Sequence, residues 1–394
     1  MNKIKSIKCH RFSSRYGESN NSFGQPLGLK TIVLVTVESS RGESRSHELY
    51  AGIYMPEIFP IIISKISEFY INKNISLEIA MESNKFPFTA NSGILKSVMG
   101  AIDSCIIQLY FSSKQISLVE GLKTLLVPTI RRNYESQKLK YYGSGGSVAF
   151  SAEECIRDLD KIYLNNLDGF KMRCGLQEFA KDIDRVTKVS EYIKSQKNKK
   201  TPNLMVDFIQ GTLKPKLGVK DLINYLNMLR EVNIYWIEEP LNPDEVTLYE
   251  NLINCNYEQF KFCLGESFTC LNEYFAFHKI IDFFQIDVTH CGGFTESTKI
   301  LNFFGDKKKS ARFSAHVWGS GLSGLLNLAI CRACETVSWF EIPLINFDVN
   351  YHLFNTFELK YNELSDSDID SYLANINLKT NDKFNFVENS GYRI

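Results

Sequence analysis

From about Leu139 onward, short runs of β-branched and aromatic residues alternate with longer stretches whose apolar residues recur at helical spacing. The repeat has a period of roughly 30 residues, which is typical of strand–helix units that close into a parallel barrel. There are eight such runs, the strand number of a (β/α) barrel. They are Leu139–Tyr142, Gly169–Arg173, Leu204–Phe208, Tyr235–Glu239, Phe262–Glu266, Phe283–Val288, Arg312–Val317 and Trp339–Ile342.

The stretches between these runs predict helices. Ser151–Leu164 has helical apolar spacing, with Ser151 placed to cap the helix and Glu154 three residues later to complete a capping box. Val219–Val232 predicts a second helix of the same kind.

The N-terminal part of the chain lacks this rhythm. Thr31–Val37 predicts a strand, Arg41-Gly42 a turn and Ser92–Phe111 a largely apolar helix, which together favour an α+β region. The loop Arg15–Gly28 is rich in Ser, Asn and Gly, and is either a lid over a barrel mouth or a plain surface loop.

We therefore predict an α/β protein in three parts. Residues 1–128 would form an α+β capping domain, residues 129–348 a (β/α) barrel, and residues 349–394 a C-terminal segment that packs back on the cap. A chain of 394 residues with 44% hydrophobic content is long enough for one large domain and a smaller one.

Charge and targeting signals narrow the choice of partners. The 45 basic and 45 acidic residues balance, so neither nucleic acid nor a membrane surface is indicated as a partner. The N-terminus has no apolar signal core, and no uninterrupted apolar stretch approaches about 20 residues, so we expect a cytoplasmic protein. Several of the 10 Cys lie in apolar segments, which favours reduced, buried thiols.

Three acidic residues stand at the ends of three successive strand-like runs: Asp207, Glu238 and Glu266. A carboxylate at the C-terminal end of a barrel strand points into the mouth where such barrels keep their chemistry, and three on neighbouring strands can share one Mg²⁺. Any one of them alone would more simply be a helix cap or a solvated strand end. Their regular spacing favours the metal site.

Lys171 and Arg173 are alternate residues of the second run, so both should project into the barrel. The permanent charge of Arg173 should disfavour protonation of Lys171 and prepare its amine to accept a proton. The alternative is that each cation forms a salt bridge with the metal carboxylates.

Asp287 and His316 end the sixth and seventh runs and should be neighbours across the mouth. An aspartate bonded to one imidazole nitrogen leaves the other free to act as an acid or base. Glu341 on the eighth run would hold a substrate oxygen or support the metal ligands. His290, in the loop after Asp287, would either touch the substrate or be a satisfied loop histidine.

Taken in order, these motifs resemble the mandelate racemase and muconate lactonizing enzyme branch of the enolase superfamily. The resemblance covers most of the chain and uses the following motifs: Lys171-Met172-Arg173 where the family has Lys-Xaa-Lys, Asp207, Trp236-Ile237-Glu238-Glu239-Pro240, Gly265-Glu266-Ser267, Asp287 with Gly292-Gly293, His316-Val317-Trp318-Gly319 and Trp339-Phe340-Glu341. It implies a modified (β/α)7β barrel with a capping domain. It also implies removal of the proton alpha to a carboxylate, with Mg²⁺ stabilising an enediolate.

The chain departs from the family pattern at three positions, and these departures favour one of the family's reactions over the others. Arg173 is a poor base where the family has a second Lys, Ile209 replaces an Asn that often follows the first metal ligand, and His290 stands where Lys is frequent. We therefore expect a Mg²⁺-dependent dehydratase of an aldonate or aldarate, with Lys171, Arg173, Asp287, His316 and Glu341 as catalytic residues. The alternatives are a racemase or epimerase, and a weakened relative that binds a sugar acid or a protein. A homo-oligomer is expected by the same resemblance.

Overall fold

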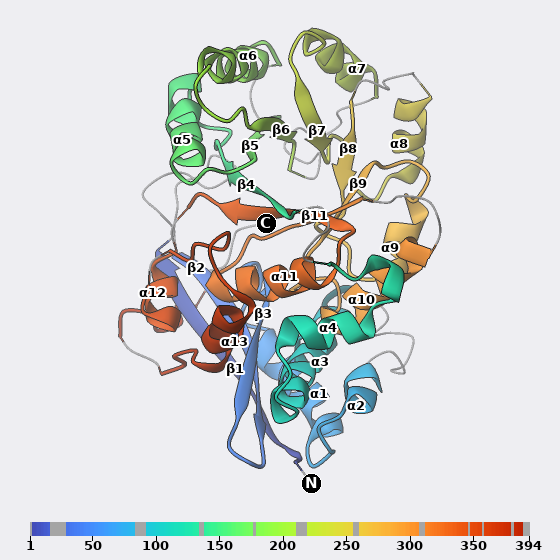
Figure 1. Cartoon of the computed structure of the whole chain (residues 1–394), viewed down its shortest axis with the longest axis vertical. Coiled ribbons are helices and arrows are strands. Elements are labelled where there is room, and N and C mark those ends of the chain that lie inside the picture. Colours follow the sequence, from blue (N-terminus) through green and yellow to red (C-terminus); the bar gives the residue numbers. More distant parts are fainter. Residues whose placement is uncertain are drawn as a thin grey trace.

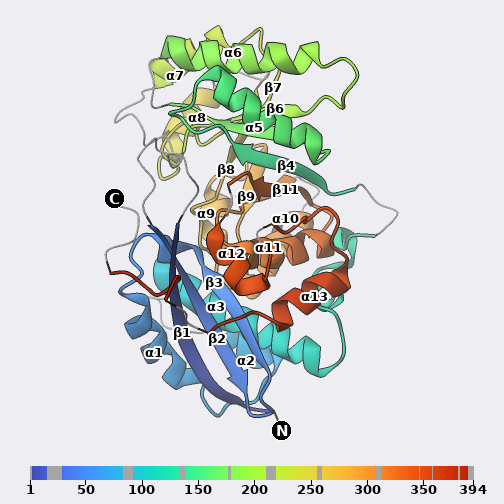
Figure 2. The same ribbon diagram turned by 90° about the vertical axis from the view of Figure 1, so that its left-hand side faces the viewer.

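The structure is a computed structural model of the whole chain (Figures 1 and 2). The residues it describes are 2–15, 29–82, 92–133, 138–175, 179–209, 219–254, 260–306, 312–345, 347–356, 358–379 and 382–388. The candidate lid loop, Arg15–Gly28, lies outside the described residues from residue 16 onward.

Eight parallel strands close into a barrel in the order β10-β11-β4-β5-β6-β7-β8-β9, which confirms the predicted fold class. The strands are β4 (Lys140–Gly145), β5 (Gly169–Arg173), β6 (Asn203–Asp207), β7 (Ile234–Glu238), β8 (Phe262–Leu264), β9 (Phe283–Ile286), β10 (Arg312–Ala315) and β11 (Val337–Pro343). Each predicted run overlaps one of these strands. The hydrophobic pattern therefore located all eight elements of the barrel.

In the described part of the chain, each of the first seven barrel strands is followed by a helix. The helices are α5 (Ala152–Leu164), α6 (Phe179–Ser195), α7 (Val219–Met228), α8 (Val246–Ile253), α9 (Leu271–Ala276), α10 (Gly293–Asp306) and α11 (Gly321–Ala333). The predicted capping box of Ser151 and Glu154 is present at the start of α5. The prediction of a helix to Val232 was too long, because the chain leaves α7 at Met228 and turns, with Val232 N–H bonded to the Leu229 carbonyl, directly into β7.

The N-terminal residues form a second layer, blue to teal in Figure 1, against one side of the barrel. Its antiparallel sheet has the order β1 (Ile4–Arg15), β2 (Leu29–Ser39), β3 (Ser44–Leu49). Its helical elements are η1 (Tyr50–Ile53), α1 (Phe59–Tyr70), α2 (Leu77–Met81), α3 (Gly93–Ser113), α4 (Leu118–Leu125) and η4 (Pro128–Ile130). From the C-terminal segment, α12 (Asp348–Phe354) packs on β1, while α13 (Asp366–Ala374) packs on β3, α4 and α11.

Helix α3 is the central helix of this layer and packs against both the sheet and α10 of the barrel. It is the one helix among the described residues that is long and apolar enough to cross a membrane, and 83% of its apolar window is buried inside the protein. Its apolar character therefore matches its place in the core.

The contact between α3 and α10 depends on glycine. A Cβ added to Gly100 of α3 would lie 2.0 Å from the carbonyl carbon of Gly292 and 2.3 Å from the nitrogen of Gly293. Both Gly292 and Gly293 have a φ of +73°, which side chains with a Cβ rarely adopt. Two backbones thus touch where the cap meets the barrel.

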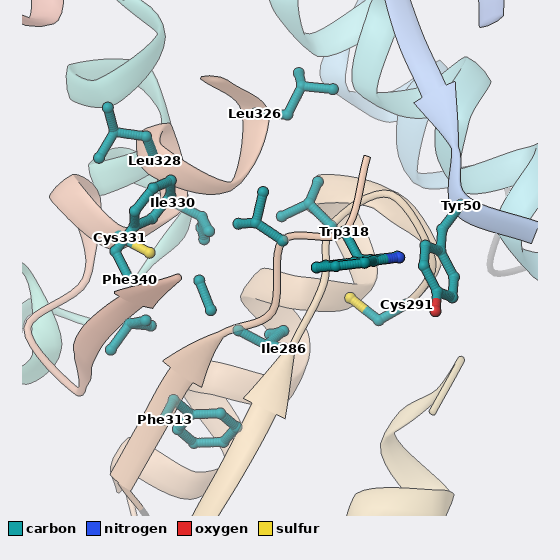
Figure 3. Close-up of a cluster of buried hydrophobic side chains, with 14 of the residues drawn as sticks. Tyr50, Ile286, Cys291, Phe313, Trp318, Leu326, Leu328, Ile330, Cys331 and Phe340 are labelled. Atoms are coloured by element: carbon teal, nitrogen blue, oxygen red, sulfur yellow. The ribbon is translucent and has the colours of Figure 1, made fainter. Parts of the chain in front are cut away.

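The floor of the barrel is aromatic. Interior-facing side chains of six strands form a separate cluster made of Tyr142, Met205, Trp236, Cys263, Phe283 and Trp339. The main core lies outside the barrel, between strands and helices, and continues to Trp318 and to Tyr50 of the cap (Figure 3). All nine described cysteines are free thiols and eight are buried, which confirms the prediction of reduced, buried Cys.

Candidate active site

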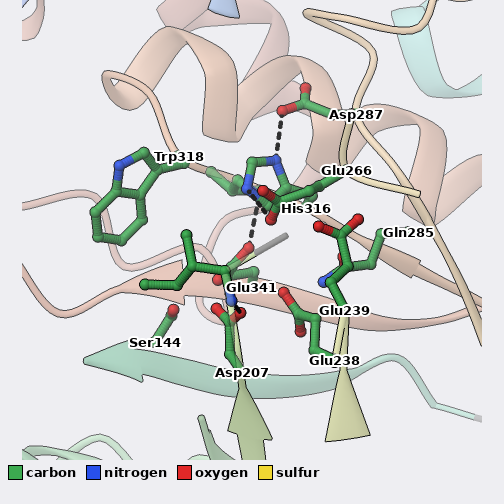
Figure 4. A network of polar contacts seen from close by, with 12 residues as sticks. Ser144, Asp207, Glu238, Glu239, Glu266, Gln285, Asp287, His316, Trp318 and Glu341 are labelled. Carbon is green, nitrogen blue, oxygen red and sulfur yellow. Dashed lines mark hydrogen bonds and ion pairs between the residues drawn. The ribbon is translucent and has the colours of Figure 1, made fainter. Parts of the chain in front are cut away.

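The chemistry-bearing residues lie at the C-terminal ends of the barrel strands, above the aromatic floor (Figure 4). Alternate residues of a strand face the same side, so the interior position that is aromatic low in the barrel becomes polar near the mouth. On β7 the pair is Trp236 and Glu238, and on β11 it is Trp339 and Glu341.

Asp287 and His316 form the predicted pair. His316 Nδ1 lies 2.9 Å from Asp287 Oδ2, and both residues are buried. Asp287 Oδ1 accepts hydrogen bonds from Thr289 N–H, the Thr289 hydroxyl and the Asn327 amide. Burial raises the pKa of Asp287, but the bonds from His316, Asn327 and Thr289 outweigh it and keep that pKa below its usual value. Asp287 is therefore an ionised, fixed partner that leaves Nε2 of His316 facing the site.

The other side of the imidazole meets Glu266, whose Oε2 lies 3.4 Å from His316 Nε2. Burial lowers the pKa of His316, but Glu266 and Asp287 outweigh it and raise that pKa to about 9. Between two carboxylates, His316 holds a proton at neutral pH and can donate it from Nε2.

Lys171 does not behave as the sequence analysis predicted. Its Nζ lies 2.6 Å from Glu238 Oε1, 3.0 Å from Glu341 Oε1 and 3.6 Å from Asp207 Oδ2. Burial disfavours the ammonium, but Glu238 and Glu341 outweigh burial and raise the pKa of Lys171 well above its usual value. The prediction of a primed, basic amine was therefore wrong for this arrangement, and the alternative of an ion pair with the carboxylates holds.

Arg173 is fixed as a permanent cation. Its Nη1 donates to the Gly145 carbonyl at 2.8 Å, and its Nη2 donates to the Ser144 hydroxyl at 2.9 Å. The guanidinium carbon lies 4.4 Å from the centre of the Trp318 ring, while Nε is 3.8 Å from Asp207 Oδ2. Arg173 is therefore held mainly by its bonds to Gly145 and Ser144 and by the Trp318 ring, and less by the carboxylate of Asp207.

Glu341 joins the two halves of the site. Its Oε2 accepts the N–H of Val317, in the loop beside His316, and its Oε1 faces Lys171. Burial raises the pKa of Glu341, but Lys171 and His316 outweigh it and lower that pKa to about 2. Glu341 therefore stays ionised and ties β11 to the neighbouring loop.

The site carries more acid than base. Its buried carboxyl groups are Asp207, Glu238, Glu239, Glu266, Asp287 and Glu341, against the basic side chains of Lys171, Arg173 and His316. Burial and Asp207 raise the pKa of Glu238 to about 8, and burial raises the pKa of both Glu239 and Glu266. Burial and the neighbouring carboxyl groups therefore make these three groups harder to ionise, and a further cation would favour their ionised form.

The oxygen donors at Asp207, Glu238 and Glu266 and the surplus of carboxylates fit a hard divalent cation. Their present arrangement, however, surrounds the ammonium of Lys171, and in the described residues no group of three His, Cys, Asp or Glu side chains is already placed to hold a metal. A metal at these residues would displace Lys171 from Glu238, because both need the same oxygens.

The cap contributes residues that the sequence analysis missed. The ring of Tyr50 packs edge-on against His316, with centroids 5.3 Å apart, and against His290 at 5.4 Å. Lys30 Nζ donates to the Trp318 carbonyl, and Glu48 accepts hydrogen bonds from Ser320. No motif marks Tyr50, because it enters the site only through the docking of β3 on the barrel.

The sequence analysis missed Asn327, although the sequence carries a signal for it, and named His290 with two interpretations. Asn327 is a fully buried amide in the otherwise apolar stretch of α11, and that interruption was a signal for a specific polar partner. His290 lies next to Tyr50, and its Nε2 is 3.0 Å from the Ser267 carbonyl. Its Nδ1 is buried and has no hydrogen-bond partner among the described residues, so only one of the two ring nitrogens is satisfied, and both interpretations of His290 stay predictions.

Comparison with known proteins agrees with this geometry. Residues 154–364, which are 211 of the 394 residues, match the family model described as enolase C-terminal domain-like. The chain belongs to the enolase superfamily. The predicted family is thus confirmed. No curated protein matches the chain by sequence.

Solved structures of enolase superfamily members share the fold. A member of the superfamily from Polaromonas sp. JS666 is 18% identical, with a TM-score of 0.77 and 100% of both chains covered. L-Talarate dehydratase from Polaromonas sp. JS666, complexed with Mg and L-glucarate, is 20% identical, with a TM-score of 0.66 and 87% of both chains covered. The 3,6-anhydro-D-galactonate cycloisomerase from Zobellia galactanivorans is 18% identical, with a TM-score of 0.68 and 86% of this chain and 87% of that chain covered. At these identities the likeness establishes the fold of this superfamily member and leaves its reaction open.

Proposed function

We propose that the chain is a Mg²⁺-dependent dehydratase of an acid sugar, an aldonate or aldarate. The observation that carries this proposal is that the two sides of the barrel mouth carry different groups. On one side stands an imidazole paired with an ionised aspartate, His316 with Asp287, and on the other stand Lys171 and Arg173, both held as cations. Such a site has one residue that can move protons and two that can bind anionic oxygens.

The metal, when bound at Asp207, Glu238 and Glu266, would supply positive charge to a substrate carboxylate that becomes more negative as its alpha proton leaves. Arg173 is placed to hold an anionic oxygen, since its position is fixed by Gly145, Ser144 and Trp318. Tyr50 covers His316 from the cap side and excludes water from the imidazole.

His316 has two states that suit elimination of water. With Glu266 and Asp287 both ionised it is protonated and can donate its Nε2 proton to a leaving hydroxyl. A cation held by Glu266 would offset the carboxylate that most raises the pKa of His316, and the imidazole would then be more available as a base. Asp287 stays ionised in both states and fixes the Nδ1 side of the ring.

There are two alternatives to the dehydratase, a different reaction and a binder without catalysis, and each is supported by a specific observation. A racemase or epimerase would use Lys171 as the base on the opposite face, and requires Lys171 to leave its ion pairs with Glu238 and Glu341. A catalytically weakened binder is favoured by Arg173 and by Lys171 standing where the metal would bind. The racemase or epimerase would act on a hydroxy acid, and the binder would hold a sugar acid or a protein partner.

The test is a mass-spectrometric screen of aldonates and aldarates with the purified protein and Mg²⁺ in D₂O. A substrate that loses the mass of water supports the dehydratase. Deuterium gain without water loss would replace it with an epimerase, and calorimetric binding without either change would replace it with a binder. Parallel reactions with His316→Asn and with EDTA should both be silent.

A further inference from the structure

A second polar cavity lies within the cap and shares no lining residue with the barrel site. It has a volume of about 360 Å³ and lies where β3, α3, α4 and α13 meet (Figure 1). Arg45 of β3, Gln108 of α3 and Asp370 of α13 bring polar groups to it, and its apolar lining comes from Ile116, Leu118 and Leu373.

Arg45 presents donors to this cavity. Its Nη1 donates to the Ser44 carbonyl at 2.8 Å and its Nη2 to the Ser112 hydroxyl at 2.9 Å. A guanidinium has five N–H groups, so three remain after these bonds. Across the described ranges, Arg45 has no carboxylate within the 4.0 Å of an ion pair. A partly buried cation with free donors is suited to hold a carboxylate.

Asp370 of α13 presents an acceptor to the same cavity. Asp370 Oδ1 accepts the Leu118 N–H at 3.0 Å, which leaves Oδ2 as an acceptor, and burial raises the pKa of this carboxyl group. Gln108 is only 4% exposed, and its Nε2 donates to the Ser46 carbonyl, but its Oε1 receives no hydrogen bond from any described residue. Gln108 Oε1 is enclosed by the protein, so the acceptor left for a ligand in the cavity is Asp370 Oδ2.

We propose that this cavity binds the zwitterion of an α-amino acid with an aliphatic side chain. Its carboxylate would pair with Arg45, and its ammonium would donate to Asp370 Oδ2. A simple anion would leave Asp370 without a cationic partner, and a simple amine would leave Arg45 without an anionic one. The aliphatic side chain would contact the apolar lining from Leu118 and Leu373.

The test uses the full-length protein and three probes of equal shape. L-Leucine carries both charges, isocaproate lacks the ammonium, and isoamylamine lacks the carboxylate. Isothermal calorimetry should show L-leucine binding, with each analogue weaker by about tenfold or more, the value of one charge-assisted contact. L-Leucine should also raise the thermal unfolding temperature.

Substitutions of cavity residues test whether the ligand binds there. Arg45→Met and Asp370→Asn should each lose L-leucine binding. The matched control Arg41→Met removes an arginine at an exposed position between β2 and β3, outside the cavity, and should bind as the parent does. If Arg45→Met fails to fold, the isosteric Asp370→Asn carries the test.

The proposal is overturned if the folded protein takes up no L-leucine at millimolar concentrations, or if the three probes bind alike. Binding that survives in Asp370→Asn would also overturn it. Because the readout is binding to the cap, these outcomes are independent of whether the barrel catalyses dehydration.

Discussion

His316 Nδ1 lies 2.9 Å from Asp287 Oδ2, and the other oxygen of Asp287 is held by Thr289 and Asn327. The imidazole therefore cannot rotate without breaking a bond to an anchored carboxylate. We expect His316→Asn to lower kcat by about two to four orders of magnitude, the usual contribution of a positioned acid or base, while Mg²⁺ binding is retained. Turnover on the screened substrate and calorimetry with Mg²⁺ measure the two effects.

The control for this variant is His278→Asn, which changes a half-buried histidine just after α9, away from the barrel mouth, and should leave kcat unchanged. Substantial turnover by a well-folded His316→Asn protein would mean that the dyad is not the proton-transfer group.

Removing Lys171 should destabilise the protein, because buried carboxylates would then lack their cation. Lys171→Met leaves Glu238 and Glu341 without their cation, and breaking a buried pair in this way typically costs about 3–5 kcal/mol of stability. Mg²⁺ should restore part of this loss, because it neutralises the same oxygens. Urea unfolding of the parent and variant, each with Mg²⁺ and with EDTA, measures both terms. An equal loss under the two conditions would show that metal and ammonium do not share these oxygens.

The metal assignment predicts which carboxylates control affinity. Asp207→Asn and Glu266→Gln should each weaken Mg²⁺ binding by at least about tenfold, since the loss of even an outer hydrogen bond has that effect in metal sites. Glu250→Gln, an exposed carboxylate on α8, should bind Mg²⁺ as the parent does. Calorimetric titration reads the affinities directly. Unchanged affinity in both site variants would move the metal elsewhere.

Asp103 of α3 makes the stability of the protein depend on pH. Burial raises its pKa to about 8, against bonds and charge from Thr295 and Lys96 that act to lower it. An unfolded Asp titrates near 3.9, so a folded pKa that is raised adds stability below that pH, and this stability is lost as pH rises towards about 8. Relative to Asp103→Asn, which cannot titrate, the free energy of unfolding should fall by up to about 1.4 kcal/mol per pH unit across this window. A pH-independent difference in urea unfolding would contradict the assignment.

The contact of Gly100 with Gly292 and Gly293 predicts whether Gly100→Ala stabilises or destabilises the protein. In a helix free of neighbours, Gly→Ala stabilises by about 1 kcal/mol, because alanine loses less conformational entropy on folding. At Gly100 the added Cβ would lie 2.0 Å from backbone, so Gly100→Ala should destabilise the protein by separating α3 from α10. Thermal unfolding gives the sign, and a stabilised variant would show that the two helices are not in contact.

The sequence by itself determined the architecture. Eight apolar runs at barrel spacing became eight barrel strands, because burial of strands on both faces requires that pattern whatever the details of packing. Carboxylates at strand ends were readable for the same reason: strand alternation fixes that Asp207 and Glu238 face the interior at the mouth. The pairing of Asp287 with His316 followed from neighbouring strands.

Only the tertiary structure decided which charges meet. Lys171 was expected to respond to Arg173, two residues away, but Glu238 and Glu341 from other strands govern its pKa, and no sequence spacing encodes those distances. Tyr50 reaches His316 through the docking of the cap, and the helix contact at Gly100 depends on residues almost 200 positions away. Electrostatic energy depends on separation in space and on burial, and both are set when distant segments pack together.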